Sequence, residues 1–193
     1  MNSIIVKHKE YEIEEIISNN IFKCSFKNKT YIIYKLNVEM DNYKNYLFLL
    51  SKLFHSGVKV PKLKVIDKKN GYVVKEFLEG TTIFDYIVEN DFNEDIYKSI
   101  FFNSYCAKMA GLNLSFDLKN WTIVGKDLVY NDIYVEKYDP KKDFTKTKIR
   151  EWFMGNELFE YYKNNGILLE NSRKKSEFEV NKEMVLMTCK YYL

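Results

Sequence analysis

The sequence predicts an α+β fold in which a β-rich first part, residues 1–80, precedes a mostly helical second part, residues 81–193. Before residue 78, runs of β-branched and aromatic residues alternate with turn residues, which is typical of antiparallel strands. A single helical pattern interrupts these runs, and helical spacing dominates after residue 81. A chain of 193 residues suits one domain, or two small parts that share a cleft.

Three antiparallel strands are expected near the start of the chain. The stretch "YEIEEIISNNIFKCSFKNKTYIIYKL" is rich in Ile, Phe and Tyr, and it is divided by the turn signals Ser-Asn-Asn and Lys-Asn-Lys. These turns place the strands at about residues 11–17, 21–27 and 30–36.

A helix and two further strands complete the first part. Apolar residues recur at helical spacing in "DNYKNYLFLLSKLFHSG", where Asp41 can cap the start and Gly57 can close the end. Two strands, residues 62–67 and 71–77, follow around the turn "DKKNG". The first part therefore predicts a five-stranded antiparallel sheet with one helix.

The second part is predicted to hold four helices and one hairpin. A short helix is expected in "TTIFDYIVEN" and a longer one in "NEDIYKSIFFNSYCAKMAG", where Gly111 ends the helix. The runs "WTIV" and "DLVY" predict a hairpin at about residues 121–132. Helices are expected at about 145–165 and 177–192, and Ser176 with Glu179 forms a capping-box pattern for the last one.

Composition excludes several classes of protein. The net charge is only +3, so the chain as a whole is not expected to bind nucleic acid. The most apolar stretch, "YLFLLSKLF", is too short to span a bilayer, and the N-terminal run does not resemble a signal peptide. The three cysteines are far apart and form no CxxC pair, so we expect reduced thiols and a cytoplasmic location rather than disulfides or a zinc site.

The candidate chemistry lies around the predicted hairpin. Asn120 precedes the hairpin and Asp132 follows it, so two oxygen ligands of the kind that Mg²⁺ prefers would lie at its ends. Ser115 and Asp117 lie just before Asn120 in "NLSFDLKN". The simpler alternative is that Asn120 and Asp132 only cap the hairpin, as short polar side chains often do.

The order of elements and these motifs resemble the protein-kinase-like superfamily, in the compact form of aminoglycoside- and choline-phosphotransferase-like or RIO-type kinases. The resemblance covers roughly residues 11–165 and implies a two-lobed fold with a short C-lobe that uses ATP and Mg²⁺. It implies that Lys35 in "YIIYKL" holds phosphate, and that Asn120 and Asp132 hold Mg²⁺. It also implies that the backbone of a hinge in "YVVKEFLEG" reads the adenine edge. The hinge residues are Glu76, Phe77 and Leu78.

The sequence departs from this family at several positions. Ser115 occupies the place of the catalytic aspartate, which leaves Asp117 as the candidate substitute base. The turn "ISNNIF" contains no glycine, and the usual helix glutamate is missing near Tyr46. Two functions therefore stay open. One is phosphoryl transfer to a protein or small-molecule hydroxyl, and the other is a catalytically impaired pseudokinase that binds nucleotide or a protein partner.

Two further expectations concern other parts of the chain. We expect Lys35 and Asp132 to face one another across a cleft between the lobes. A third functional class is RNA binding through the basic run "DPKKDFTKTKIR", because the aromatic residues Tyr138, Phe144 and Trp152 lie in or beside it. A solvated helix start is the simpler explanation of that run. His8 and His55 have no acid-nucleophile arrangement around them.

Overall fold

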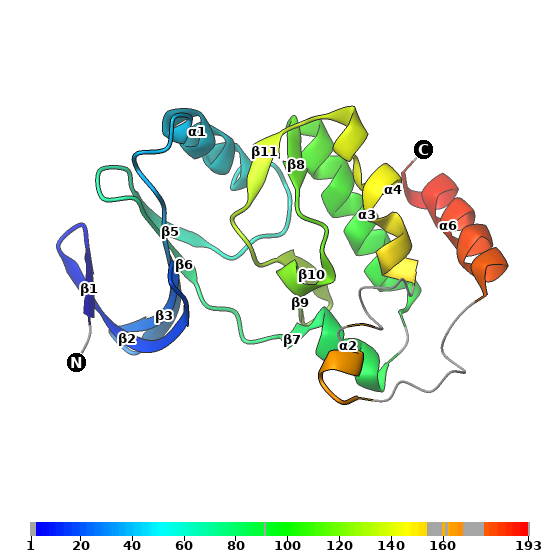
Figure 1. Cartoon of the computed structure of the whole chain (residues 1–193), viewed down its shortest axis with the longest axis horizontal. Helices are drawn as coiled ribbons and strands as arrows, with labels where there is room; N and C mark the ends of the chain where they lie inside the picture. The colour runs from blue at the N-terminus through cyan, green and yellow to red at the C-terminus, as the bar shows by residue number, and fades with distance from the viewer. Residues whose placement is uncertain (1–2, 91, 154–159, 161, 168–175, 193) are drawn as a thin grey trace.

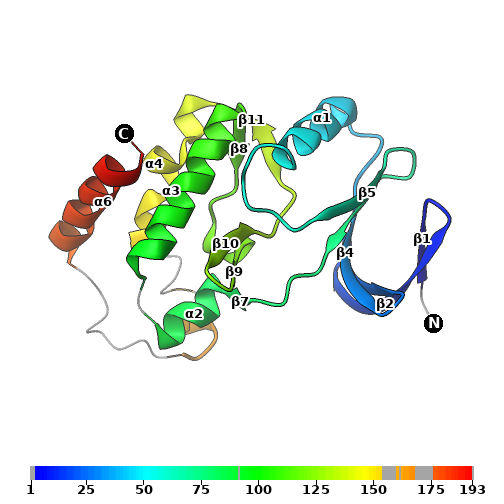
Figure 2. The ribbon, with the colours of Figure 1, turned by 180° about the vertical axis from the view of Figure 1, so that it is seen from behind.

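The computed structural model describes residues 3–90, 92–153, 160, 162–167 and 176–192, and it is a mixed α+β structure (Figure 1). A curled antiparallel sheet and one helix form the N-terminal part. A mostly helical part with two small sheets follows it, as the view from behind also shows (Figure 2). The predicted α+β class is confirmed.

The main sheet has six strands rather than the predicted five. Its strand order is β1-β2-β3-β4-β6-β5, and all neighbours are antiparallel. The strands are β1 (Ser3–Val6), β2 (Lys9–Ser18), β3 (Ile21–Phe26), β4 (Lys29–Lys35), β5 (Leu63–Asp67) and β6 (Tyr72–Glu76). Helix α1 (Tyr43–Leu53) connects β4 to β5. The five predicted strands and the helix lie where the sequence placed them, to within two residues.

The additional strand β1 forms a hairpin with β2 through the turn at Lys7 and His8. Both residues have positive φ, 45° and 68°, which are backbone values that Gly and Asn adopt more readily. The turn therefore lacks the usual sequence signal, and the hairpin was not predicted. Lys27 and Asn28 form the β3–β4 turn in the same way, with φ of 51° and 58°.

The helical part begins after residue 80. Its helices are α2 (Ile83–Glu89), α3 (Glu94–Met109), α4 (Phe144–Thr147) and α6 (Glu177–Tyr191), and its 3₁₀ turns are η1 (Leu118–Asn120), η2 (Pro140–Lys142) and η3 (Ile149–Phe153). Its strands are β7 (Thr81–Thr82), β8 (Leu112–Leu114), β9 (Trp121–Val124), β10 (Asp127–Tyr130) and β11 (Val135–Lys137). The predicted hairpin is β9–β10, and the capping box of α6 is formed as predicted.

The single helix predicted at residues 145–165 is not formed as such. Its first part is the short helix α4 followed by η3, while residues 154–159 and 161 lie outside the described residues. Asp143 accepts hydrogen bonds from the backbone N–H and the hydroxyl of Thr145, and its carbonyl accepts one from the Thr147 hydroxyl. The Asp143 side chain thus caps the start of α4, while the bond from the Thr147 hydroxyl to the carbonyl four residues before it weakens the continuation of the helix.

One large hydrophobic core runs from the inner face of the sheet into the helical part. It joins Ile32 and Tyr34 of β4, Leu50 of α1, and the fully buried Trp121 and Trp152. A second, smaller core covers the other face of the sheet around Tyr31 and Ile33. The two faces of β4 therefore pack against different cores. Among the described residues, none of the helices has the length and apolar character needed to cross a bilayer.

Asn103 of α3 joins three segments within the large core. Its side chain is fully buried, accepts a hydrogen bond from the Lys59 N–H at 2.8 Å, and donates to the carbonyls of Ser99 and Leu128. It thereby fixes the residue 59 loop and β10 against α3. A buried polar group without a hydrogen-bond partner costs about 1–3 kcal/mol. The loss of Asn103 is therefore expected to lower the free energy of unfolding more than the loss of one exposed hydrogen bond.

We predict that Asn103→Ala lowers the free energy of unfolding by about 2–4 kcal/mol, because it leaves buried backbone groups without partners. Asn93→Ala, which removes the side-chain cap of α3 and an exposed bond to the Tyr86 hydroxyl, is the matched control and is expected to cost about 1 kcal/mol. Urea denaturation followed by circular dichroism measures both. An equal loss in the two variants would contradict the role given to Asn103.

Candidate functional site

The four residues singled out around the hairpin line one groove of about 520 Å³. The residues are Ser115, Asp117, Asn120 and Asp132. The loop between β8 and β9 supplies the first three, and the segment after β10 supplies Asp132. Lys119, Lys142 and Lys148 line the same groove. The grouping expected from the sequence is therefore present.

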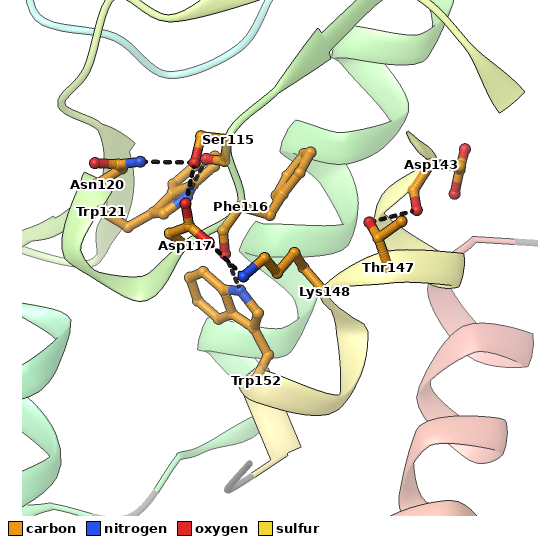
Figure 3. A network of polar contacts seen from close by, with 9 residues as sticks. All are labelled: Ser115, Phe116, Asp117, Asn120, Trp121, Asp143, Thr147, Lys148 and Trp152. Carbon is orange, nitrogen blue, oxygen red and sulfur yellow. Dashed lines mark hydrogen bonds and ion pairs between the residues drawn. The ribbon is translucent and has the colours of Figure 1, made fainter. Parts of the chain in front are cut away.

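Ser115 lies at the centre of a side-chain network (Figure 3). Its hydroxyl donates to the Asp117 carboxylate at 2.7 Å and accepts from the Asn120 amide nitrogen at 2.8 Å. Its carbonyl accepts from the Trp121 indole at 3.2 Å, and its N–H donates to the Tyr130 hydroxyl at 3.3 Å. Because Asn120 uses its N–H on Ser115, its side-chain oxygen stays available as a ligand.

Asp117 is held as a carboxylate. Its second oxygen pairs with the Lys148 amine at 2.6 Å. Burial by itself raises the pKa of Asp117. The hydrogen bonds from Lys148 and Ser115 outweigh burial, so the pKa of Asp117 lies below its usual value. The side chain therefore carries a negative charge at neutral pH and can accept a proton only if a contact with Ser115 or Lys148 is exchanged.

Asp132 lies on the same groove as Asn120 and is half-buried. One of its oxygens accepts the N–H of the following residue, Ile133, at 2.7 Å. Its charge also acts on nearby phenols, because burial first and Asp132 second raise the pKa of Tyr34 and of Tyr46. Asp132 therefore faces the groove while it lies close to the sheet.

Aromatic packing supports the loop that carries Ser115 and Asp117. The Phe116 ring stacks on Trp121 with centroids 5.5 Å apart, and the Trp152 indole donates to the Phe116 carbonyl at 2.7 Å (Figure 3). Phe144 packs against Phe116 at 4.8 Å. Phe144 and Trp152 are thus core residues, and the RNA-binding alternative loses two of its three aromatic contacts because both side chains are buried.

A buried lysine that the sequence analysis missed joins the sheet to the hairpin. Lys75 of β6 is fully buried, and its amine donates to the main-chain carbonyl of Asn131 and, at 3.1 Å, to the Asn131 side-chain oxygen. The same amine lies 4.9 Å from the centre of the Tyr34 ring. The Tyr34 hydroxyl donates to the Asn131 carbonyl at 3.0 Å.

The segment 131–133 is also held from α1. The Tyr46 hydroxyl donates to the Ile133 carbonyl at 2.8 Å. The family resemblance implies a glutamate near Tyr46 that pairs with the strand lysine. In this chain, the Tyr46 phenol lies there instead and binds the backbone. We call Lys75, Tyr34 and Tyr46 the clamp, because together they fix the backbone on both sides of Asp132.

Lys35 is placed differently from the expectation. It is exposed at the end of β4, and the residues on either side of it, Tyr34 and Leu36, pack into the large core. Alternation along the strand therefore directs Lys35 to the opposite face. The structure does not bring Lys35 and Asp132 together, and the lysine beside this segment is Lys75. In the sequence, Lys35 and Lys75 each follow a run of apolar strand residues. The pattern alone therefore does not show which of the two lysines is buried.

The hinge residues have most of their backbone donors in use. The N–H of Glu76 donates to the Lys62 carbonyl at 3.0 Å, and the N–H of Phe77 donates to the Thr30 carbonyl at 3.1 Å. The Glu76 carboxylate pairs with Lys64 at 2.5 Å. Leu78 lines a different groove, of about 510 Å³. The N–H groups of Glu76 and Phe77 are therefore not available to a ligand in this conformation.

The chain matches no protein-family model and no curated protein. Within the described residues, no group of three or more His, Cys, Asp or Glu side chains is placed to hold a metal ion. A divalent ion in the groove would thus depend on Asn120, Asp132 and oxygens brought by a ligand, which is how proteins commonly hold Mg²⁺.

We predict that Lys75 makes stability increase with pH. Burial lowers the pKa of Lys75 to about 7, against a smaller opposing effect of Asp132. Above that pH the unfolded chain binds a proton that the folded chain lacks, so the free energy of unfolding rises by up to about 1.4 kcal/mol per pH unit up to the unfolded pKa. Relative to Lys75→Met, the wild type is expected to gain stability between pH 7 and 9.

Chemical denaturation at pH 7, 8 and 9 measures this difference. Lys35→Met removes an exposed lysine from the adjacent strand β4 and serves as the matched control, whose difference from the wild type is expected to stay constant. Parallel pH profiles for the wild type and Lys75→Met would show that Lys75 keeps its proton in the folded state.

Proposed function

We propose that the chain has a two-lobed protein-kinase-like fold with a short C-lobe. Residues 1–80 form the N-lobe, with a curled antiparallel sheet and one helix, α1, inserted after β4. Residues 81–193 form the C-lobe, in which the β9–β10 hairpin separates Asn120 from Asp132. The order of these elements and the position of the hairpin support the proposal.

We infer that this fold binds ATP with Mg²⁺ and transfers a phosphoryl group to a hydroxyl of a protein or a small molecule. The observation that carries the inference is the meeting of Asp117, Asn120 and Asp132 on one groove. Phosphoryl transfer depends mostly on positioning the reactants and on neutralising phosphate charge. A fixed carboxylate that can act as a base, beside two oxygen ligands for a metal ion, meets these two requirements.

Each residue has a separate role in this proposal. The Asn120 side-chain oxygen and the Asp132 carboxylate would hold Mg²⁺, which neutralises phosphate charge when it is bound. Asp117 accepts the proton of the acceptor hydroxyl, a role for which its lowered pKa keeps it deprotonated. Lys119, Lys142 and Lys148 line the groove and give it cations that attract phosphate.

A second candidate function is a pseudokinase that binds a partner and does not catalyse transfer. Three observations favour it. Lys35 lies on the face opposite to the clamp. The Lys75 amine already donates hydrogen bonds to Asn131. The N–H groups of Glu76 and Phe77 donate to carbonyls within the chain. A nucleotide would therefore lack the usual lysine and hinge contacts unless these bonds are exchanged.

We predict that millimolar ATP with Mg²⁺ raises the melting temperature of the wild type. Ligand at about 100 times its dissociation constant adds about 2.7 kcal/mol, which corresponds to roughly 5–10 °C for a chain of this size. Asp132→Asn is expected to abolish the Mg²⁺-dependent part, because it removes the charged ligand. Asp127→Asn, at an exposed position in the hairpin turn, is the matched control and is expected to keep the full shift.

Differential scanning fluorimetry with and without EDTA measures the shift. An equal shift in Asp132→Asn and the wild type would remove Asp132 from the metal site. The absence of any shift in the wild type would contradict nucleotide binding and leave a partner-binding role for the fold.

We also predict that Asp117→Asn lowers phosphate release or autophosphorylation by about 10²–10⁴-fold while ATP binding remains, because loss of a general base typically costs that factor. Ser115→Ala is expected to lower the rate much less, since it removes a bond to Asp117 but leaves the carboxylate in place. Radiolabelled ATP measures both variants. The reverse ranking would show that Asp117 is not the base.

A further inference from the structure

The N-terminal sheet carries a second cavity on the face opposite to the clamp. The cavity has a volume of about 360 Å³ and lies where the curl of the sheet brings its two edge strands, β1 and β5, toward each other. Lys7 in the β1–β2 turn lies close to the buried carboxylate of Asp67 at the end of β5. The two edges of the sheet therefore approach each other beside Lys7, which lines the cavity.

Aromatic rings form the floor of this cavity. Tyr11, Phe26 and Tyr31 line it, with the Tyr11 ring 5.2 Å from that of Phe26 and 5.6 Å from that of Tyr31. Tyr11 is only 3% exposed and Tyr31 only 7% exposed. The Tyr11 ring is tilted by 40° from the Phe26 ring and by 85° from the Tyr31 ring, so the three rings form an angled apolar floor with two phenol groups beside it.

The two phenol hydroxyls make no hydrogen bond within the part of the chain that the structure describes. Both oxygens keep some accessible surface, and both residues line the cavity. Buried phenols normally find a hydrogen-bond partner. A ligand in the cavity can therefore supply the partner that both hydroxyls lack within the described chain.

The charge around the cavity is positive. Lys7, Lys9 and Lys64 line it together with Tyr11 and Tyr31. Lys64 also pairs with the Glu76 carboxylate at 2.5 Å, which leaves Lys7 and Lys9 as the excess charge. The amine of Lys9 lies 5.9 Å from the Phe26 ring centre, at the edge of the aromatic floor.

We propose that this cavity binds a small oxyanion attached to a planar apolar group, as in an aryl phosphate or an aryl carboxylate. The oxyanion accepts hydrogen bonds from the hydroxyls of Tyr11 and Tyr31 and from the Lys64 amine, and the planar group lies on the Phe26 ring. Lys7 and Lys9 attract the charge from the rim. The site is separate from the proposed phosphotransfer groove, because Tyr31 and Tyr34 lie on opposite faces of β4.

The test is a titration of the ¹⁵N-labelled full chain followed by amide NMR. Phenyl phosphate and benzoate are the two anionic probes, and they distinguish a phosphate ligand from a carboxylate ligand. Inorganic phosphate tests the charge alone, and benzyl alcohol tests the ring alone. We expect saturable shifts at the amides of Lys7, Lys9 and Val65 with at least one anionic probe, and at least tenfold weaker binding of inorganic phosphate and benzyl alcohol.

Matched variants assign the contacts. The double variant Tyr11→Phe with Tyr31→Phe keeps both rings and removes both hydroxyls, and we expect it to weaken binding at least tenfold. Lys64→Met provides a second, independent loss of the anion contact. Tyr105→Phe, at an exposed position on α3, is expected to leave binding unchanged.

Three results would overturn the proposal. The first is the absence of saturable shifts with both anionic probes. The second is unchanged affinity in the double phenylalanine variant and in Lys64→Met, and the third is inorganic phosphate binding as tightly as phenyl phosphate. Unperturbed spectra of the free variants confirm that each one is folded.

Discussion

The buried amine of Lys75 is the interaction on which the arrangement of the groove depends. Burying a charged ammonium is costly, and the chain reduces that cost by giving the amine two oxygen partners on Asn131 and by lowering its pKa to about 7. The carbonyl of Asn131 also accepts from Tyr34, and that of Ile133 accepts from Tyr46. Asp132 lies between these two anchored carbonyls, so the sheet and α1 determine where its carboxylate can lie.

The other side of the groove is fixed by aromatic packing instead of buried charge. Trp152 binds the carbonyl of Phe116, and Phe116 stacks on Trp121, so the loop that carries Ser115 and Asp117 rests on the large core. Two supports thus position Asp117 and Asp132, and they are linked where the Asn131 N–H donates to the Asn120 carbonyl at 2.7 Å and the Ser115 N–H donates to the Tyr130 hydroxyl. Preorganisation of this kind is what positioning catalysis requires. A loss of packing at Trp152 would therefore act first on the loop that carries Asp117, which the Trp152 indole binds directly.

Local patterns predicted most of the elements and the grouping of the candidate site, because the strands, α1, α3 and the α6 cap depend on spacing and on capping residues. The hairpin strand β1 was missed because Lys7 and His8 adopt a backbone that usually requires Gly or Asn. The family resemblance pointed to Lys35 of β4, and only the sheet register and the burial show that Lys75 of β6 is the lysine that enters the core. The hinge bonds of Glu76 and Phe77 depend on contacts with Lys62 and Thr30, which sequence spacing does not reveal.

The Ser115 hydroxyl now donates to Asp117, which is the bond that an acceptor hydroxyl would make to a general base. In the phosphotransferase proposal, Ser115 is therefore a stand-in that an acceptor replaces, and Asn120 keeps the serine oxygen close by while its own carbonyl oxygen binds metal. In the pseudokinase alternative, the same serine permanently occupies the base. Lys148 restrains Asp117 from the other side in both cases, so the exchange of one short hydrogen bond at Ser115 separates an active groove from a closed one.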